Sequence, residues 1–296
     1  MNNLKDKVAV ITGGNSGIGY ATAKELKAQG ATVIITGRRK EAIEKAAAEL
    51  GVTAIVADQS EVAATESLAA QVSRDFGKID ILFINAGIVG ISKIEDATEA
   101  MFDEVMAVNF RGAYFTLSKF IPLLNDGASV VFLSSNVASM NGAGSSIYSS
   151  SKAALNSVMK IAALELAPRK IRVNAVSPGP TETEILNKMG VDEDTLKTIK
   201  SSILGRIPLK QMGTAEDVAG MVAYFCSDAA KFITGAEILM DGGMSFSLDK
   251  VFFYQDALYP GQRIPLFKDL KDRTDLKLSE CKAFASRVVC LHYKKA

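Results

Sequence analysis

Short runs of apolar, mostly β-branched residues recur along the chain and alternate with longer segments of helical periodicity. The runs are "KVAVIT" (7–12), "TVIIT" (32–36), "VTAIVA" (52–57), "IDILFI" (79–84), "ASVVFLS" (128–134), "IRVNAVS" (171–177) and "AEILMD" (236–241). Strands that are apolar throughout are typical of parallel sheets buried on both faces. We therefore expect an α/β protein with a doubly wound, seven-stranded parallel sheet and helices on both faces. In such a fold the ligand binds at the C-terminal ends of the strands.

Glycines mark the ends of several intervening helices. The segments 17–29, 39–50 and 61–76 are each followed by a glycine, which suits the left-handed residue that ends many helices. After residue 246 the alternation stops. We expect residues 1–246 to form one domain, and residues 247–296 to be an irregular C-terminal extension of unknown role.

Charge and rare residues exclude several classes of function. With 34 basic and 33 acidic residues the net charge is +1, so we expect neither a nucleic-acid partner nor a membrane-binding surface. The charged first residues and the lack of a long apolar stretch indicate a cytoplasmic protein. The three cysteines (Cys226, Cys281 and Cys290) are not in CxxC spacing, which argues against a disulfide framework or a metal site. The only histidine, His292, lies in the last five residues, so His-dependent hydrolysis is not expected.

A glycine-rich turn follows the first predicted strand. The segment "TGGNSGIG" (12–19) has Gly13, Gly17 and Gly19 in the pattern TGxxxGxG and does not fit GxGxxG. Glycines let the backbone turn tightly and approach a pyrophosphate, which the start of the following helix stabilises. A tight strand–helix connection also favours glycine, but the position after the first strand favours a dinucleotide site.

The chain resembles the short-chain dehydrogenase/reductase family. The resemblance rests on the glycine turn together with "AD" (57–58), "INAG" (84–87), "VNFRG" (108–112), "LSS" (133–135), "YSSSK" (148–152), "NAVSPGPTET" (174–183) and "TGAEILMDGG" (234–243). These motifs occur in the family's order and cover residues 1 to about 246. One departure is Ile84, where the family has asparagine. The resemblance implies a Rossmann-type fold and an NAD(P)-dependent oxidoreductase.

The resemblance also implies which residues contact the cofactor. Asp58 would accept a hydrogen bond from the adenine amino group, although a simple cap at the strand end is the alternative. Thr183 would meet the nicotinamide carboxamide, or cap a following helix, or both. The other implied contacts are Gly13, Asn15, Ser16, Gly17, Ile18 and Gly19 of the turn, Asn85, Ala86 and Gly87 at the sheet end, Pro178, Gly179 and Thr181, and Tyr148 and Lys152.

The end of the second predicted strand bears on the choice between NAD and NADP. NAD-preferring sites usually place an acid here, whereas this chain has Arg38 and Arg39 after Gly37. A guanidinium pairs well with a 2'-phosphate, which favours NADP. The alternative is that both arginines are solvated residues at the start of the next helix. Asn15 and Ser16 in the turn, where many NADP-preferring relatives carry a basic residue, leave NAD possible.

Tyr148 and Lys152 are spaced four residues apart, and so lie on one face of a predicted helix. A tyrosine can donate the proton that carbonyl reduction needs, but its ordinary pKa near 10 is poorly matched to neutral pH. We expect the charge of Lys152 to lower the pKa of Tyr148. In isolation such a pair is common on solvated helices.

Ser135 and Asn109 complete the catalytic set that the resemblance implies. Ser135 lies thirteen residues before Tyr148, at the family's spacing, and would donate a hydrogen bond to the substrate oxygen. Ser134 is the alternative if the strand register differs by one residue. Asn109, in a helix expected over 98–124, would hold a water that links Lys152 to solvent.

Two further segments bear on substrate and assembly. Residues 183–212 fall where the family has a mobile substrate lid, and their apolar residues suit either a pocket or ordinary helix packing. Helices expected over 98–124 and 147–167 carry apolar residues on more than one face, among them Phe110, Tyr114, Phe115, Val158 and Ile161. The resemblance implies that these helices pair between subunits, so we expect a homodimer or homotetramer.

Together these features favour an NADP-dependent oxidoreductase that interconverts a carbonyl compound and an alcohol, with Tyr148 as the acid/base. An NAD-preferring enzyme, an epimerase or dehydratase on the same fold, and a non-catalytic dinucleotide-sensing or scaffold protein are the alternatives. The substrate is a small molecule whose identity the sequence does not specify.

Overall fold

The computed structural model describes residues 4–140, 142–182, 193–246, 276–283 and 289–295. The chain divides into two compact units, Met1–Ser247 and Leu248–Ala296. The first unit contains the predicted sheet with its helices.

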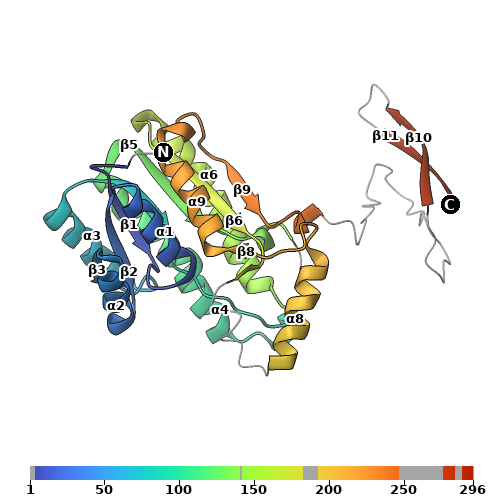
Figure 1. Ribbon diagram of the computed structural model, residues 1–296, viewed down its shortest axis with the longest axis horizontal. Coiled ribbons are helices and arrows are strands. Elements are labelled where there is room, and N and C mark those ends of the chain that lie inside the picture. The colour runs from blue at the N-terminus through green and yellow to red at the C-terminus, as the bar shows by residue number, and fades with distance from the viewer. Residues whose placement is uncertain (1–3, 141, 183–192, 247–275, 284–288, 296) are drawn as a thin grey trace. The chain divides into compact units, whose positions relative to one another are not determined.

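All seven predicted strands are present and form one parallel sheet of order β3-β2-β1-β4-β5-β6-β9 (Figure 1). The chain therefore builds the sheet outward from β1 to β3 and then crosses over to build from β4 to β9. The C-terminal ends of β1 and β4 mark this change of direction, where ligands bind in doubly wound folds. The strands are β1 (Val8–Thr12), β2 (Thr32–Gly37), β3 (Thr53–Val56), β4 (Ile79–Ile84), β5 (Leu124–Leu133), β6 (Arg172–Pro178) and β9 (Glu237–Met240).

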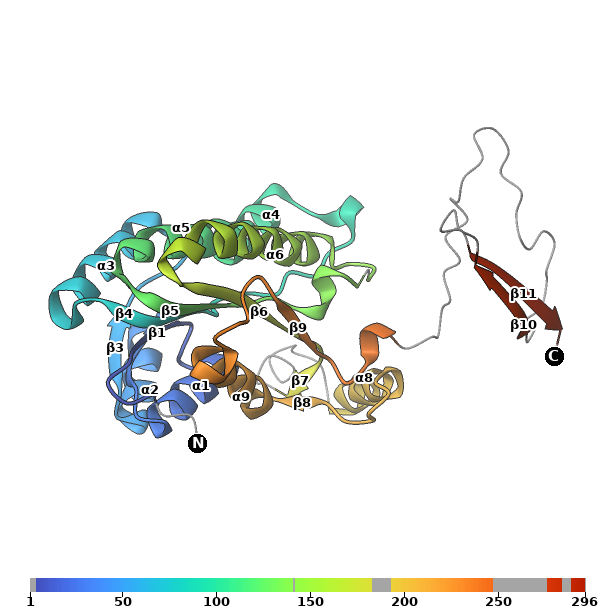
Figure 2. The same cartoon turned by 90° about the horizontal axis from the view of Figure 1, so that it is seen from above.

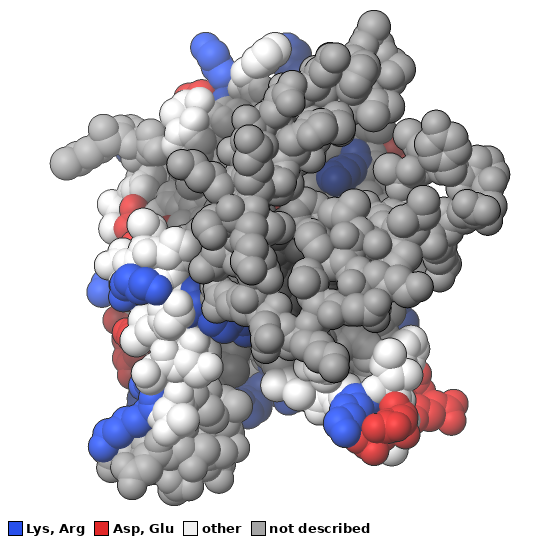
Figure 3. Space-filling model, turned by 90° about the vertical axis from the view of Figure 1, so that its right-hand side faces the viewer, with Lys and Arg blue, Asp and Glu red and all other residues white. Residues whose placement is uncertain are grey.

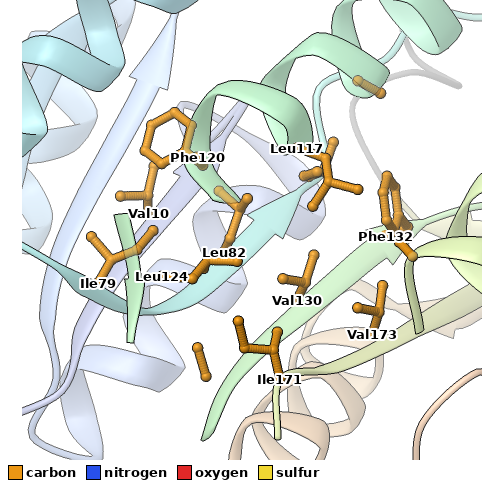
Figure 4. Close-up of a cluster of buried hydrophobic side chains, with 14 of the residues drawn as sticks. Val10, Ile79, Leu82, Leu117, Phe120, Leu124, Val130, Phe132, Ile171 and Val173 are labelled. Carbon is orange, nitrogen blue, oxygen red and sulfur yellow. The ribbon is translucent and has the colours of Figure 1, made fainter. Parts of the chain in front are cut away.

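Helices cover both faces of the sheet, as Figure 2 shows. One layer contains α3 (Val62–Phe76), α4 (Glu99–Met106), α5 (Ala113–Phe120) and α6 (Ser146–Leu166). The other contains α1 (Gly17–Ala28), α2 (Lys40–Leu50) and α9 (Ala215–Cys226). Each layer packs on its own apolar core. Figure 4 shows one of them, where Leu117 and Phe120 of α5 meet Val10, Leu82 and Val130 of the sheet. This burial is the main force that fixes the strand ends in place.

The helix predicted over 98–124 is present without a gap over residues 99–123, but its type changes along its length. It consists of α4, a π-helical segment over Ala107–Gly112, α5, and a 3-10 turn over Ile121–Leu123, after which β5 already begins at Leu124. A β-carbon on Gly112 would lie 2.2 Å from the carbonyl oxygen of Gln59, so only glycine allows this close approach. Segments of π-helix are frequent at functional sites, and this one contains Asn109.

Further elements follow the strands at the C-terminal edge of the sheet. These are a 3-10 helix over Asn136–Ala138, the strand pair β7 (Thr181–Glu182) and β8 (Gly213–Thr214), and α8 (Glu193–Arg206). α9 begins with a capping box, in which Thr214 and Asp217 each accept a hydrogen bond from the other's backbone N–H. No helix among the described residues is both long and apolar enough to cross a membrane.

In the second unit the structure describes an antiparallel pair of strands, β10 (Leu276–Ala283) and β11 (Val289–Lys295). The sequence did not predict these strands, because no helical segment or strong apolar run surrounds them. On the face of the molecule in Figure 3, the described residues carry both basic and acidic side chains, in keeping with the net charge of +1.

Candidate active site

The glycine turn between β1 and α1 forms a tight cradle. Gly13 has a φ of +67°, which favours glycine, and a β-carbon on Gly19 would lie only 2.2 Å from the carbonyl oxygen of Gly13. The turn therefore brings the start of α1 against the end of β1, with room for neither side chain. Backbone N–H groups at such a helix start suit a phosphate group.

A cleft of about 460 Å³ opens above this cradle at the C-terminal ends of the strands. It contains most of the residues that the sequence predicted for the cofactor. Those that line it are Gly13, Asn15, Ser16, Gly17, Ile18, Arg38, Arg39, Asp58, Asn85, Ala86 and Gly87. Gly19 does not line the cleft, and its lack of a side chain allows the close contact with Gly13. The size, the glycine cradle and the polar lining fit a dinucleotide.

Thr12 links the glycine turn to the end of β4. It is the first residue of the glycine motif, and the sequence predicted no role for it. Its buried hydroxyl oxygen accepts hydrogen bonds from the backbone N–H groups of Asn85 and Ala86, both at 3.0 Å. The Asn85 side-chain amide in turn donates to the carbonyl oxygens of Thr12 (2.8 Å) and Gly13 (3.0 Å). The Asn85 side chain thus holds the glycine turn against the end of β4 at the base of the cleft.

At the adenosine end, the structure accommodates both interpretations of Asp58. The carboxylate oxygen Oδ1 accepts hydrogen bonds from the backbone N–H (2.9 Å) and the hydroxyl (2.8 Å) of Ser60, as a strand-end cap does. Asp58 also lines the cleft. Likewise, Arg38 and Arg39 are exposed and precede α2, yet both line the same cleft.

A second cleft, of about 270 Å³, contains Ser135, Tyr148 and Lys152. Ile18, Asn85, Gly87, Ile88 and Leu133 line both clefts, so the two form one continuous site. Pro178, Gly179 and Thr181 also line the second cleft. Thr183, and with it the first part of the segment predicted as a lid, lies outside the described residues. Met212, at the end of that segment, lines the cleft.

The structure distinguishes Ser135 from Ser134. The side chain of Ser135 makes a hydrogen bond with Tyr148, whereas the Ser134 hydroxyl donates to the main-chain carbonyl of Lys152 at 3.4 Å. The pKa of Tyr148 lies above its ordinary value, because burial in the cleft outweighs the hydrogen bond with Ser135, which lowers it. The sequence-based expectation that Lys152 lowers this pKa is therefore wrong for the protein without a cofactor. The Lys152 ammonium nitrogen lies 5.9 Å from the centre of the tyrosine ring.

Lys152 is almost fully buried, and burial lowers the pKa of its ammonium group to about 8. Its Nζ donates a hydrogen bond to the carbonyl oxygen of Leu133 at 2.8 Å. A β-carbon on Gly87 would lie 3.4 Å from this nitrogen, so Gly87 leaves space at the lysine that a side chain would crowd. At pH 7 the Lys152 side chain is therefore still mostly charged.

Asn109 is completely buried in the π-helical segment, and its side chain is fully engaged with protein groups. Oδ1 accepts from the Ile88 backbone N–H at 2.8 Å, while Nδ2 donates to the Ile88 carbonyl oxygen at 2.8 Å and to Ser151 Oγ at 3.2 Å. The side chain therefore holds the loop after β4 against α6. Gln59, which sequence reasoning missed, extends this link by donating to the carbonyl oxygens of Ala86 and Val108.

Comparison with known proteins agrees with this geometry. A family model described as enoyl-(acyl carrier protein) reductase matches residues 13–245. An uncharacterized oxidoreductase of Methylorubrum extorquens is 35% identical over 250 residues, which cover 82% of this chain and 100% of the relative. An L-rhamnose 1-dehydrogenase (NAD(P)(+)) of Azotobacter vinelandii is 34% identical, covering 83% of this chain and 99% of the relative. A crystal structure of a short-chain dehydrogenase/reductase from Brucella melitensis has a TM-score of 0.77 at 32% identity, covering 82% of this chain and 98% of that one.

Proposed function

The chain belongs to the short-chain dehydrogenase/reductase family of oxidoreductases, and from that premise we propose that it reduces a small, uncharged ketone or aldehyde with NADPH and catalyses the reverse oxidation of the alcohol. The observation that carries the proposal is the meeting of Ser135, Tyr148 and Lys152 in a cleft continuous with the glycine cradle.

The residues of the first cleft would hold the cofactor. The cradle around Gly13 and the start of α1 would bind the pyrophosphate, and Lys152 would bind the ribose hydroxyls next to the nicotinamide. A bound nicotinamide dinucleotide supplies the hydride for the carbonyl carbon, or accepts it in the reverse direction.

Tyr148 would donate the proton to the carbonyl oxygen. Its raised pKa keeps the hydroxyl protonated at neutral pH, which is the form that reduction requires. Ser135 would donate a hydrogen bond to the same oxygen as negative charge develops there. Once Tyr148 has given up its proton, Ser135 and the charged Lys152 would stabilise the phenolate.

The lining of the second cleft favours an uncharged substrate. Among its described residues, Lys152 is the only one with a charged side chain, and its nitrogen already donates to Leu133. Ile88, Val89 and Met212 give the walls an apolar character. A carboxylate or phosphate would lose its water here without gaining a dedicated partner.

Turnover of a carbonyl panel, followed by the absorbance of the reduced nicotinamide, tests the proposal. We expect a neutral cyclic ketone to be reduced and its carboxylate-bearing analogue to be reduced far more slowly. Tyr148→Phe should retain cofactor binding and lose about 10²–10⁴-fold in kcat, whereas Tyr224→Phe, at an exposed tyrosine of α9, should match the wild type. Turnover retained by Tyr148→Phe would overturn the mechanism. Cofactor binding without turnover on any substrate would instead favour a non-catalytic role, and isomerisation without net cofactor turnover an epimerase.

The preference for NADP is proposed on the two arginines at the adenosine end. Arg38 and Arg39 line the cleft next to Asn15 and Ser16, where a 2'-phosphate can pair with a guanidinium. We expect a higher kcat/KM with NADPH than with NADH. The opposite preference would show that the arginines are solvated residues at the start of α2.

We also propose that the protein is a homodimer or homotetramer, paired through α4, α5 and α6. Of the residues predicted for this surface, Tyr114 and Ile161 are exposed, whereas Phe110 and Val158 pack on the core. Leu164 adds a further exposed apolar side chain, at 78% exposure. Burial of these side chains would stabilise an interface. Light scattering that gives the mass of one chain would refute this.

Residues 1–246 are proposed to carry the whole site, with 247–296 as a separate extension. In support, the two relatives are matched over 99–100% of their length by 82–83% of this chain. Truncation after Ser247 should therefore leave kcat and KM unchanged, and a loss of activity would assign the extension a part in the site.

A further inference from the structure

Asp241 is a buried carboxylate that has no part in the site as described so far. It follows β9, is 7% exposed, and begins a turn in which Gly242 and Gly243 both have positive φ. Its oxygen Oδ1 accepts a hydrogen bond from the Gly243 backbone N–H at 3.0 Å. Oδ2 accepts from the Ser245 backbone N–H at 2.7 Å and from the Ser245 hydroxyl. Burial raises the pKa of Asp241, but these hydrogen bonds outweigh it and hold the pKa below its ordinary value, so the group is ionised at neutral pH.

The same carboxylate also reaches toward the catalytic cleft. The side chain of Asn136, itself 5% exposed, lies beside Asp241, since a β-carbon on Gly179 that meets Asp241 would also lie 3.2 Å from the Asn136 amide nitrogen. Hydrogen bonding from Asn136 contributes to the lowered pKa of Asp241. The Asn136 amide nitrogen has a second acceptor in the Met140 sulfur, at 3.2 Å. A β-carbon on Gly179 would lie 2.5 Å from the Asp241 β-carbon, so the backbone after β6 passes directly against the same residue. Asp241 therefore joins the three loops that follow β5, β6 and β9.

Ser135, the neighbour of Asn136, is only weakly fixed by its own side chain. Apart from its bond with Tyr148, the hydroxyl donates to the Pro178 carbonyl oxygen at 3.5 Å and accepts from the Val137 backbone N–H at 3.4 Å, both near the limit of a hydrogen bond. The position of this hydroxyl must come mainly from its backbone. On one side the backbone is fixed by the Ser134 N–H, which donates to the Val176 carbonyl oxygen at 2.8 Å. On the other side, the Ser135 carbonyl oxygen accepts from the Ala138 backbone N–H at 3.0 Å, at the start of the 3-10 turn that contains Asn136.

We propose that Asp241 is a positioning residue, which holds Ser135 in place against Tyr148 by anchoring the side chain of Asn136. This inference rests on the proposed function, because Ser135 needs a fixed position only if it assists carbonyl reduction. Asp241 touches neither substrate nor cofactor, and its effect passes through one amide–carboxylate hydrogen bond. Hydrogen bonds to an ionised carboxylate are stronger than those between neutral groups.

Two substitutions each remove one hydrogen-bond donor from the Asp241 carboxylate, one from the loop after β5 and one from the turn after β9. Asn136→Ala removes the bond that leads to Ser135, and Ser245→Ala removes the hydroxyl bond that does not. We expect Asn136→Ala to lower kcat about tenfold, less than the ~10²–10³-fold loss when an oxyanion donor is deleted outright. Cofactor affinity should stay unchanged. Ser245→Ala should keep the kcat of the wild type.

The pH profile of alcohol oxidation separates positioning from a merely structural role. The Ser135 hydrogen bond lowers the pKa of Tyr148, so a displaced Ser135 should move the acidic limb of the profile to higher pH. Lys152, the other titratable group next to Tyr148, is unchanged in both variants. We expect this movement in Asn136→Ala and not in Ser245→Ala.

A second variant, Asn136→Ser, keeps a shorter polar side chain and should behave like Asn136→Ala; thermal melting checks that each variant folds. If the wild type reduces ketones and the Asn136 variants match Ser245→Ala in both kcat and pH profile, the positioning role is overturned while the proposed function stands. If the wild type binds cofactor and turns over no carbonyl compound, the proposed function and the positioning role are both overturned.

Discussion

Replacement of Lys152 by methionine should stabilise the cofactor-free protein near neutral pH. Burial lowers the pKa of the Lys152 ammonium from 10.5 to about 8. At about 1.4 kcal/mol per pKa unit, the charged form is therefore about 3 kcal/mol less favourable in the folded protein than in the unfolded chain. Methionine fills similar space without a charge, but it loses the hydrogen bond to the Leu133 carbonyl oxygen, which contributes about 1 kcal/mol. The expected net gain in the free energy of unfolding is about 2 kcal/mol at about pH 7.

The stability difference between Lys152→Met and the wild type should change sign as the pH rises. Below the folded pKa of about 8, Lys152 is protonated in both states and the folded protein carries the whole cost. Between about 8 and 10.5 only the unfolded chain keeps the proton, so the unfolded state binds more protons and the wild type becomes more stable as pH rises. Above 10.5 the charge no longer matters and the variant should be less stable by about 1 kcal/mol.

Urea denaturation followed by circular dichroism measures this effect, since the chain has no Trp to serve as a fluorescence probe. Wild type and variants are compared at one protein concentration, because any oligomer makes stability concentration-dependent. Lys160→Met, at an exposed lysine of the same helix, is the matched control and should differ little from the wild type at every pH. Differences from the wild type that run parallel to this control across the whole range would refute the argument.

Two further predictions concern the glycine cradle and the Cys226 thiol. Gly19→Ala places a methyl group against Gly13 and Asn85, and should weaken cofactor binding by more than tenfold when it is measured by calorimetry. The control is Gly220→Ala on α9, where nothing lies within 4 Å; it should bind the cofactor normally and gain about 0.5–1 kcal/mol of stability. Equal cofactor affinity in the two variants would contradict the proposed cradle. Cys226 is half-buried, and burial raises the pKa of its thiol to about 12. In a Cys281→Ser, Cys290→Ser background, iodoacetamide should therefore label it at pH 8 more slowly in the folded protein than after denaturation. Equal labelling rates in the two states would contradict the raised pKa.

The strands and the glycine turn could be predicted from the sequence because their causes are local. Apolar runs such as "IDILFI" must be buried on both sides wherever they lie, and the spacing of Gly13 and Gly19 follows from one tight turn. The π-helical segment around Asn109 was not predictable in this way. It depends on Ile88 and Gln59, which lie 21 and 49 residues from the groups they bind in this segment. The Asp241–Asn136 bond was missed for the same reason, since it joins residues that follow different strands.

The error over Tyr148 shows which physical effect a sequence motif leaves out. The four-residue spacing to Lys152 says that a charge is near, and a nearby positive charge favours a phenolate. It says nothing about how much water the fold removes from the hydroxyl. In the structure the removal of water is the larger effect, and the lysine itself responds to burial with a lowered pKa. Both groups are thereby shifted toward their neutral forms. The motif thus brings the two side chains together, whereas the depth of the cleft determines how far burial shifts their pKa values.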